Sequence, residues 1–587
     1  MTKFLSQILP SIDCKIVTVD GNEIENIDEI DNIPITSLVF DSREVTTDSL
    51  FFALQGTHLD GNKFIPSAIK NGANAVIYQD DLSENLQKEI AKVITERTID
   101  NELSNNIHKF APVLIKVKDS RIAMSPLSDS FYDSPSKRLI VIGVTGTEGK
   151  SSTVSFIWQL LKKCGFKAGF ISTVEYSFGN EALPNPQHQT TPEAPIIQHH
   201  LNKMLENGCS YAVVEASSHG LSAKLNRCGN VIFDCAIFMN VTLEHLEFHK
   251  NFENYRNDKA NLFRALDKTS HIKVISGEQR KINSIGIVNL EDPSASFFMN
   301  ATKSNIYGFT TEGKARMAAW EKGEDSIPLP KIPEHTRYMV AHNIASITHG
   351  LSFNIDTDGE NALFDSDYDS VRPREHFNID IKSYLPGAFN TYNIMASLIA
   401  VSSVTNLSFE QIAKHTTELN PIKGRMTVIE EGQDFEVIVD YAHTPSSFET
   451  IFPPLRKRLS GKLFALFGSG GERDLTKRPL QGEMAAKYCD VIVLADEDPR
   501  GEDPEKLLRD IAVGAEKMGK IMGENLFIIH ERQKAIRAVL KMARKGDIVL
   551  FLGKAHENSI IYKDFVMPYD EITEVKTALN ELKLTNR

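Results

Sequence analysis

The stretch Val141-Ile-Gly-Val-Thr-Gly-Thr-Glu-Gly-Lys-Ser-Ser-Thr153 constrains this chain more than any other part of its sequence. An apolar run over Leu139–Val144 is followed by a glycine-rich turn and then by a helical pattern. This order is typical of a phosphate-binding loop, in which Lys150 reaches the terminal phosphates and Ser151 offers a hydroxyl to Mg²⁺. The spacing departs from the standard pattern, because the first glycine stands one residue early, at Gly143. An ordinary tight turn before a helix is the competing interpretation, and the complete strand, loop and helix order disfavours it.

Length and composition favour a multidomain globular protein over a nucleic-acid-binding or membrane protein. The 587 residues predict three domains, and the 41% hydrophobic and 24% charged contents are typical of globular proteins. The net charge of −13 argues against a basic nucleic-acid-binding face. The six cysteines form no Cys-x-x-Cys pair, and neither a signal peptide nor a membrane span is evident. We therefore expect a cytoplasmic protein with neither nucleic acid nor membrane as a partner. A monomer is a further expectation, which the sequence itself does not determine.

The first two thirds of the chain divide into two predicted domains. Residues 1–137 contain short apolar runs and end in the polar stretch Tyr132–Arg138, which is a predicted linker. Residues 138–421 alternate strand-like and helix-like segments, including the strand candidates Tyr211–Glu215 and Asp234–Asn240, and so predict an α/β domain with a mostly parallel sheet. Within it, the polar, acid-rich residues 311–380 are expected to form a peripheral excursion.

Residues 422–587 predict a second α/β unit with a Rossmann-like order. The strand candidates are Phe435–Val439, Leu463–Phe467, Val491–Ala495, Leu526–Ile529 and Ile548–Leu552. Polar residues follow four of these strands, at Asp440, Ser469–Asp474, Asp496–Arg500 and Gly553–Glu557. Because ligands of such sheets bind beyond the carboxyl ends of the strands, these positions predict a binding site.

Two strand ends in the central domain carry candidate metal ligands. Glu215 ends one strand, and a carboxylate near a phosphate loop is a natural Mg²⁺ ligand. Another strand leads into Asn240-Val-Thr-Leu-Glu-His245-Leu-Glu-Phe-His249, where two histidines four apart could share a helix face. Taken one at a time, these residues read as surface polar groups, and the set lacks enough suitable ligands for zinc.

The phosphate loop resembles that of the Mur ligase family, the ATP-dependent ligases of peptidoglycan synthesis. The resemblance lies in Thr145-Gly-Thr-Glu-Gly-Lys-Ser151, with Glu148 where the family usually has Asn. The related folylpolyglutamate synthetases carry a similar loop. The resemblance implies that ATP binds Thr145, Gly146, Thr147, Glu148, Gly149, Lys150, Ser151 and Ser152.

Further motifs follow in the order that the family has. Glu215-Ala-Ser-Ser-His-Gly-Leu and the segment from Asn240 to Phe263 resemble its metal-binding segments, with Glu244 and Asp258 as departures. The resemblance implies that Ser151, Glu215 and His245 bind Mg²⁺ and that Lys259 is a carbamylated lysine, formed with CO₂, whose carbamate oxygen is a hard ligand. It also implies that Lys150, Lys259, His245 and Glu215 form the catalytic set.

Later motifs imply the remaining nucleotide contacts. Gly387-Ala-Phe-Asn390-Thr-Tyr-Asn resembles the segment whose first Asn contacts the nucleotide. Gly424-Arg425-Met and Val439-Asp440-Tyr-Ala-His443-Thr-Pro resemble elements that close the C-terminal domain over ATP. By this resemblance Arg425 meets phosphate and Asp440 the ribose.

The N-terminal segment resembles the uridine-nucleotide domain of the family members that add the third residue of the stem peptide. The similar motifs are Phe40-Asp-Ser42-Arg43 and Leu50-Phe-Phe-Ala-Leu-Gln-Gly-Thr-His58-Leu-Asp-Gly. The implied contacts to UDP-N-acetylmuramoyl-L-alanyl-D-glutamate are Phe40, Ser42, Thr57, His58, Leu59, Thr190, Thr191, Ser217 and Arg227.

Three C-terminal motifs resemble the family's pocket for the incoming diamino acid. The implied contacts are Arg473, Glu497, Asp498, Pro499, Arg500, Gly553 and Glu557. Arg473 and Arg500 suit carboxylates, and Glu557 suits an ammonium. Arg500 favours meso-diaminopimelate, which has a distal carboxylate, whereas Asp498 in place of the family's Asn favours a bare amine such as that of L-lysine or L-ornithine. The two signals conflict, with a slight preference for diaminopimelate.

The sequence predicts a three-domain α/β protein with a central P-loop ATPase-like domain. The resemblance implies an enzyme that joins a diamino acid to the D-glutamyl γ-carboxylate through an acyl phosphate. A folylpolyglutamate-synthetase-like ligase would share the chemistry, but the N-terminal motifs argue against it. A P-loop ATPase that is not a ligase would need no amino acid. A non-enzymatic nucleotide-binding protein is the weakest alternative, since every expected catalytic position is filled.

Overall fold

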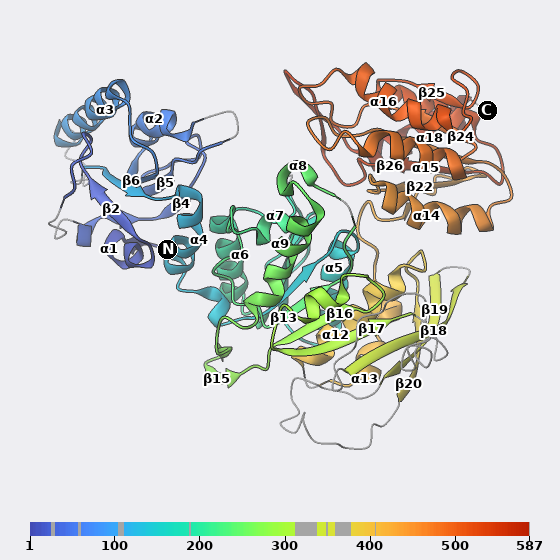
Figure 1. The fold of residues 1–587 in the computed structure, drawn as a ribbon, viewed down its shortest axis with the longest axis horizontal. Helices are drawn as coiled ribbons and strands as arrows, with labels where there is room; N and C mark the ends of the chain where they lie inside the picture. The colour runs from blue at the N-terminus through green and yellow to red at the C-terminus, as the bar shows by residue number, and fades with distance from the viewer. Residues whose placement is uncertain are drawn as a thin grey trace.

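The computed structural model describes residues 1–24, 30–56, 60–103, 111–186, 189–242, 244–311, 337–347, 350–357, 377–405 and 407–585. Its three α/β domains follow one another along the chain (Figure 1). We propose domain boundaries at 137/138 and 421/422, between the three main sheets. None of the described helices is both long enough and apolar enough to cross a membrane.

The N-terminal domain contains a five-stranded sheet in the order β2-β7-β6-β5-β4, parallel except for the β2–β7 pair. Its strands β1 and β3 form a separate antiparallel pair. Its strands are β1 (Lys3–Phe4), β2 (Cys14–Val17), β3 (Pro34–Ile35), β4 (Ser37–Val39), β5 (Ser49–Phe52), β6 (Ala73–Tyr78) and β7 (Val113–Val117). Its helices are α1 (Leu5–Ile8), α2 (Ile65–Lys70), α3 (Glu84–Leu103) and α4 (Ser120–Phe131). β6 is buried along its whole length, which fits a central strand covered on both faces.

The central domain is an eleven-stranded sheet in the order β11-β10-β9-β12-β8-β13-β16-β17-β18-β19-β20. Its strands are β8 (Ile140–Thr145), β9 (Ala168–Ile171), β10 (Glu175–Ser177), β11 (Leu183–Pro184), β12 (Tyr211–Glu215), β13 (Cys235–Phe238), β16 (Ile285–Asn289), β17 (Asn305–Thr310), β18 (Arg337–Ile347), β19 (Gly350–Thr357) and β20 (Phe377–Ser383). A separate hairpin pairs β14 (Ile272–Ile275) with β15 (Glu278–Lys281). The helices are α5 (Lys150–Lys163), α6 (Ala194–Glu206), α7 (Ser218–Leu221), α8 (Leu246–His249), α9 (Phe252–Ala265), α10 (Ala295–Met299), α12 (Asn390–Val404) and α13 (Phe409–Ala413).

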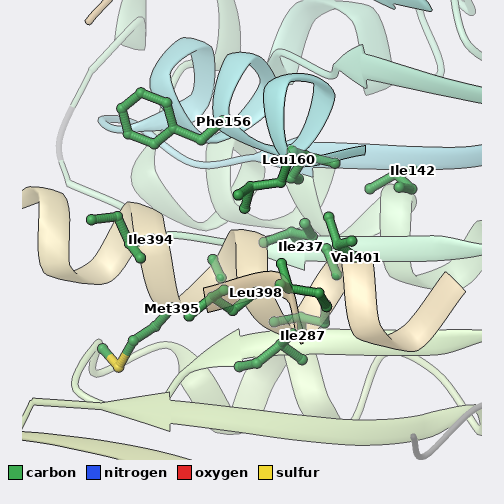
Figure 2. Packing of buried hydrophobic residues seen from close by; sticks show 14 of the residues in the cluster. Ile142, Phe156, Leu160, Ile237, Ile287, Ile394, Met395, Leu398 and Val401 are labelled. Carbon is green, nitrogen blue, oxygen red and sulfur yellow. The ribbon is translucent and has the colours of Figure 1, made fainter. Parts of the chain in front are cut away.

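Two helices from distant parts of the chain cover one face of the central sheet. Figure 2 shows Leu160 of α5 and Leu398 of α12 over Ile237 of β13 and Ile287 of β16. On the other face, α6 and α9 bury their apolar sides. Because apolar area removed from water contributes about 25 cal/mol per Å², this two-sided packing holds β8 and its neighbours in place.

The expected peripheral excursion over residues 311–380 is wrong for its described part. β18 pairs with β17 in parallel, and β19 and β20 continue the same sheet in antiparallel order. Alternate residues of β19, including Leu351, Phe353 and Ile355, are buried, so these strands belong to the core. Residues 312–336 and 358–376, which hold most of the acidic runs, lie outside the described residues.

The predicted linker Tyr132–Arg138 is not a free tether. Its Ser136 is fully buried and accepts a hydrogen bond from Lys273 Nζ at the backbone oxygen, 2.7 Å away. The side-chain oxygen of Ser136 also accepts from the N–H of Ile232 at 3.2 Å. The segment lies between α4 and β8, as a linker between the two domains would, and these hydroxyl and carbonyl groups are satisfied inside the protein.

The C-terminal domain is a six-stranded sheet in the order β21-β22-β26-β23-β24-β25, parallel except for β21. Its strands are β21 (Thr427–Val428), β22 (Glu436–Asp440), β23 (Leu463–Phe467), β24 (Val491–Leu494), β25 (Leu526–Ile528), β26 (Ile548–Leu552), β27 (Ser559–Ile561) and β28 (Val566–Pro568). Its helices are α14 (Pro445–Arg458), α15 (Lys477–Tyr488), α16 (Pro504–Lys517), α17 (Arg532–Met542) and α18 (Glu571–Thr585). All five predicted strands are present, each within one residue of its expected ends.

Candidate functional site

Three neighbouring strand ends bring the candidate site together. β8 lies between β12 and β13, and in register Glu215 pairs with Val144 and Phe238 with Thr145. The phosphate loop, the carboxylate of Glu215 and the segment that begins at Asn240 therefore lie at one edge of the sheet. This is the edge at which ligands of open α/β sheets bind.

Two glycines of the loop region have different structural roles. Gly149 is the N-cap of α5 with φ of 81°, a left-handed conformation that glycine adopts without strain. Gly143 lies inside β8, where an added Cβ would meet Leu262 at 2.5 Å and Phe233 at 2.8 Å. The early glycine that broke the expected spacing thus allows α9 to pack closely on the sheet.

Two asparagines support the loop from other segments. Asn240 Oδ1 accepts hydrogen bonds from the N–H groups of Thr147 and Glu148 at 3.1 and 2.8 Å. Asn393 Oδ1 accepts from Thr153 Oγ1 at 3.2 Å. Sequence reasoning gave neither asparagine a role, although both lie in motifs that it identified.

A cavity of about 310 Å³ opens beside the phosphate loop, between the central and C-terminal domains. Its lining includes Glu148, Gly149, Ser151, Ser152, Asn390, Arg425 and Asp440, which are seven of the residues predicted to bind ATP. Pockets of small-molecule ligands start at about this volume. The cavity therefore has the position and the size of a nucleotide site.

Side chains of the C-terminal domain reach this cavity. Arg425 Nη2 donates to Ser151 Oγ at 3.4 Å, and its guanidinium stacks 4.9 Å from the centre of the Tyr441 ring. Asp440 accepts from the N–H groups of Met426 and Ala442, both at 2.7 Å. Burial raises the pKa of Asp440, although Arg425 and these N–H groups oppose the shift.

The carboxylate of Glu215 is buried and multiply hydrogen-bonded. Its Oε1 accepts from Ser151 Oγ at 3.0 Å, while Oε2 accepts from Ser172 Oγ at 2.5 Å and from the Thr173 N–H at 2.9 Å. A carboxylate beside the hydroxyl of a phosphate loop is a suitable pair of oxygen ligands for Mg²⁺.

Lys259 lies on the buried side of α9 and is 2% exposed. Its Nζ donates to the carbonyl oxygen of Gly146 at 2.6 Å, so the amine points at the phosphate loop. Burial, and then the neighbouring Lys150 ammonium, hold the pKa of Lys259 well below its ordinary value. A neutral amine is the form that reacts with CO₂, so the site fits the proposed carbamate.

His245 and His249 do not share a helix face. His245 precedes α8 with φ of 56°, and His249 is buried against Asp258, at 2.9 Å, and Ser218, at 3.0 Å. Among the described residues, no three His, Cys, Asp or Glu side chains form a metal-ligand group. A cation site here would therefore depend on Ser151 and Lys259 as well.

The residues predicted to hold the muramoyl-peptide are partly interlinked. Thr191 Oγ1 donates to the Glu215 backbone oxygen at 2.8 Å and accepts from the Ser217 N–H at 2.9 Å. Arg227 donates to the Thr191 backbone oxygen at 2.9 Å and to Glu193 at 2.7 Å, so it already has an anionic partner. Phe40 and Ser42 lie in the N-terminal domain, and Thr57, His58 and Leu59 lie outside the described residues.

Four charged side chains lie close together among the residues predicted to hold the diamino acid. Lys554 Nζ donates to Asp498 Oδ1 at 2.9 Å and also pairs with Glu557. Arg500 Nη2 lies 4.0 Å from Asp498 Oδ2, which is too long for a hydrogen bond. Glu497, 9% exposed, lies beside this cluster, and burial raises its pKa. Sequence reasoning missed Lys554, although its position between Gly553 and Glu557 was a signal.

A small cavity of about 60 Å³ connects two predicted substrate sites. Its lining includes Thr190, predicted for the muramoyl-peptide, and Glu557, predicted for the diamino acid. Tyr441 lies in the same lining and donates to Glu557 Oε1 at 3.2 Å. Residues predicted for the two different substrates therefore lie together where the central and C-terminal domains meet.

Comparison with known proteins gives matches along most of the chain. Three family profiles match: "Mur ligase family, catalytic domain" over residues 34–132, "Mur ligase middle domain" over 144–401 and "Mur ligase, glutamate ligase domain" over 424–555. A UDP-N-acetylmuramyl-tripeptide synthetase of Treponema denticola is 47% identical, with 100% of this chain and 99% of the relative covered. A UDP-N-acetylmuramoyl-L-alanyl-D-glutamate–2,6-diaminopimelate ligase of Geobacillus kaustophilus is 32% identical over 94% of this chain and 96% of the relative. A solved diaminopimelate ligase structure has a TM-score of 0.54 and 24% identity, covering 99% and 100% of the two chains.

Proposed function

The chain belongs to the Mur ligase family of ATP-dependent, ADP-forming amide ligases of peptidoglycan synthesis, and from that premise we propose that it adds a diamino acid to UDP-N-acetylmuramoyl-L-alanyl-D-glutamate. The observation that carries this proposal is the cavity of about 310 Å³, lined by Gly149 and Ser151 of the phosphate loop and by Arg425 and Asp440 of the next domain. We place the reaction in the cytoplasm and propose that the enzyme acts as a monomer.

The proposed chemistry has two steps. The γ-phosphoryl group of ATP moves to an oxygen of the D-glutamyl γ-carboxylate, which gives ADP and an acyl phosphate. The α-amine of the diamino acid then attacks the acyl carbon and loses a proton. The bond between that carbon and the phosphate oxygen breaks, which leaves the amide and releases phosphate. Lys150 and Arg425 stabilise the negative charge that moves between the oxygens. Arg425 lines the cavity, and Lys150 lies between the cavity-lining residues Gly149 and Ser151 of the phosphate loop.

Mg²⁺ would neutralise further negative charge at the phosphates. The residues that would hold it are Ser151, Glu215, His245 and the carbamate form of Lys259. Two observations support this set: the 3.0 Å contact between Ser151 and Glu215, and the direction of the Lys259 amine toward the loop. The lowered pKa of Lys259 favours the neutral amine that carbamate formation needs.

The charge arrangement of the pocket bears on the diamino acid. Arg500 and Asp498 lie 4.0 Å apart without a direct hydrogen bond, so each can bind one charge of a distal zwitterion. This arrangement suits meso-diaminopimelate, which offers both a carboxylate and an ammonium. Asp498 also supports a second candidate, a basic diamino acid such as L-lysine or L-ornithine, because its carboxylate adds a negative charge where the family usually has an amide.

The decisive test is phosphate release by the purified enzyme with ATP and UDP-N-acetylmuramoyl-L-alanyl-D-glutamate, with each diamino acid in turn. The proposal expects release that depends on both the nucleotide-linked peptide and one diamino acid. Release without any amino acid would support a simple ATPase instead. Activity with folate and glutamate would support the folylpolyglutamate-synthetase-like alternative.

A further inference from the structure

Two departures from the family motifs meet at one place in the structure. Glu148, in the phosphate loop, accepts a hydrogen bond from Thr444 Oγ1 at 3.2 Å. Glu244, after β13, lies with Oε1 3.4 Å from His443 Nε2. His443 and Thr444 are consecutive residues at the start of α14, so both carboxylates of the central domain contact the same point of the C-terminal domain.

Thr444 has two roles at this point. As the N-cap of α14, its side chain accepts from the Ser447 N–H at 3.1 Å. Its hydroxyl also lies within donating distance of Glu148 Oε1, at 3.2 Å, and of the Ser446 and Ser447 hydroxyls, both at 3.0 Å. α14 lies on the edge of the C-terminal domain that faces the central domain (Figure 1). A nearby contact between Thr242 Oγ1 and Ser446 Oγ, at 3.3 Å, crosses the same interface.

The surroundings explain how a carboxylate is tolerated beside a phosphate loop. Burial raises the pKa of Glu148, and so does Glu244, whereas His443, Lys150 and Arg425 lower it. The N-terminal end of α14 adds a favourable partial positive charge, since a helix dipole stabilises negative groups near its first turn. Glu148 is thus held by groups of both domains.

We propose that Glu148 is a positioning residue that holds α14, and with it the C-terminal domain, against the phosphate loop through Thr444. The contact joins the two domains directly, so Glu148 favours the domain arrangement seen in this structure. In this arrangement Arg425 and Asp440 of the C-terminal domain line the cavity beside the phosphate loop. Only the kinetic consequence of the proposal rests on the proposed function; the domain arrangement does not.

The test uses two variants and two controls in the full-length enzyme. Glu148→Asn introduces the residue usual in the family, which is too short to reach Thr444, and Thr444→Val removes the hydroxyl. Thr444→Ser keeps the hydroxyl, and Glu449→Gln removes an exposed charge elsewhere on α14. Small-angle X-ray scattering without substrates reports the domain arrangement, and thermal unfolding reports whether each variant is folded.

Glu148→Asn and Thr444→Val should each increase the radius of gyration, whereas both controls should match the wild type. In steady-state assays each of the two variants should raise the KM of the diamino acid by roughly two- to tenfold, the range of one net hydrogen bond. The double variant should resemble the more affected single variant, because both changes remove the same contact.

An unchanged radius of gyration in folded Glu148→Asn, or additive effects in the double variant, would overturn the proposal. Failure of the wild type to release phosphate with any diamino acid would instead reject the proposed function and leave the scattering result interpretable.

Discussion

Lys554 and Asp498 form a buried ion pair, with Nζ 2.9 Å from Oδ1, that joins the ends of β26 and β24. The side chain of Lys554 is 1% exposed, and its pKa is raised because Glu557 and Asp498 outweigh the effect of burial. The N–H of Ile561 donates to the same oxygen of Asp498 at 2.9 Å. Asp498 therefore presents only its second oxygen, Oδ2, to Arg500 and to a substrate.

Arg500 and Asp498 should together select the diamino acid. Arg500→Ala should lower kcat/KM for meso-diaminopimelate by a factor that corresponds to about 1.5–3 kcal/mol, the value of a charge-assisted hydrogen bond. The same variant should change kcat/KM for L-lysine little. Asp498→Asn should shift the preference toward diaminopimelate by removing a carboxylate that meets a free ammonium. The measurement is kcat/KM for diaminopimelate, L-lysine and L-ornithine on the wild type and both variants.

A wild type that ignores diaminopimelate, with no change in Arg500→Ala, would show that Arg500 is structural. In that case the favoured substrate would be the basic diamino acid that Asp498 suggests.

Lys150→Ala should abolish ligation and leave the fold intact. In the described part of the chain, the Nζ of Lys150 donates to the Thr147 backbone oxygen at 2.7 Å and forms no ion pair, so its loss breaks no buried ion pair. Loss of a cation that stabilises the transferring phosphoryl group should reduce kcat by at least about 100-fold. Phosphate release and a circular dichroism spectrum check the two parts, and near-normal turnover would remove the nucleotide-site assignment.

Lys259→Ala should be nearly inactive and should regain part of its activity with a short carboxylic acid. The acid would replace the carbamate oxygens in the space left beside Gly146. Ligation by Lys259→Ala is measured over a series of acetate concentrations, with chloride as the control for ionic strength. Full activity without acetate would mean that Lys259 has no part in the reaction.

Protonation of His200 should lower the stability of the folded enzyme in mild acid. Burial lowers the pKa of His200 from 6.5 to about 4, and its Nδ1 is buried without a hydrogen-bond partner. As the pH falls, this histidine takes up a proton in the unfolded chain before it does so in the folded protein. Its contribution to the free energy of unfolding is therefore complete above pH 6.5 and is lost as the pH falls toward 4, with a loss of roughly 1–2 kcal/mol at pH 5.

His200→Phe keeps a ring beside Tyr176 and Phe178, whose ring centres each lie 5.0 Å from that of His200. The difference in unfolding free energy between pH 7.5 and pH 5 should therefore be smaller in His200→Phe than in the wild type. Urea unfolding at both pH values measures it, and equal differences in the two proteins would contradict the prediction.

The sequence by itself determined the local elements and the order of the motifs. The strand, loop and helix around Lys150, the strand Tyr211–Glu215 and the five strands of the C-terminal domain follow from apolar runs and their flanking residues. Such patterns can be recognised in a sequence because a strand buried in a sheet consists of a short run of apolar residues, whichever strands it pairs with. Polarity misled the interpretation of residues 311–380, because β18, β19 and β20 in their described part continue the central sheet.

Tertiary structure alone decided which side chains meet. Glu148 and Thr444 are 296 positions apart, and Asp498 and Lys554 are 56 apart, so no local pattern relates the members of either pair. The role of Gly143 likewise depends on the approach of Leu262 from α9. The physical reason is that backbone conformation responds mainly to near neighbours and burial, whereas the partner of a charged side chain is set by how whole sheets and helices pack against one another.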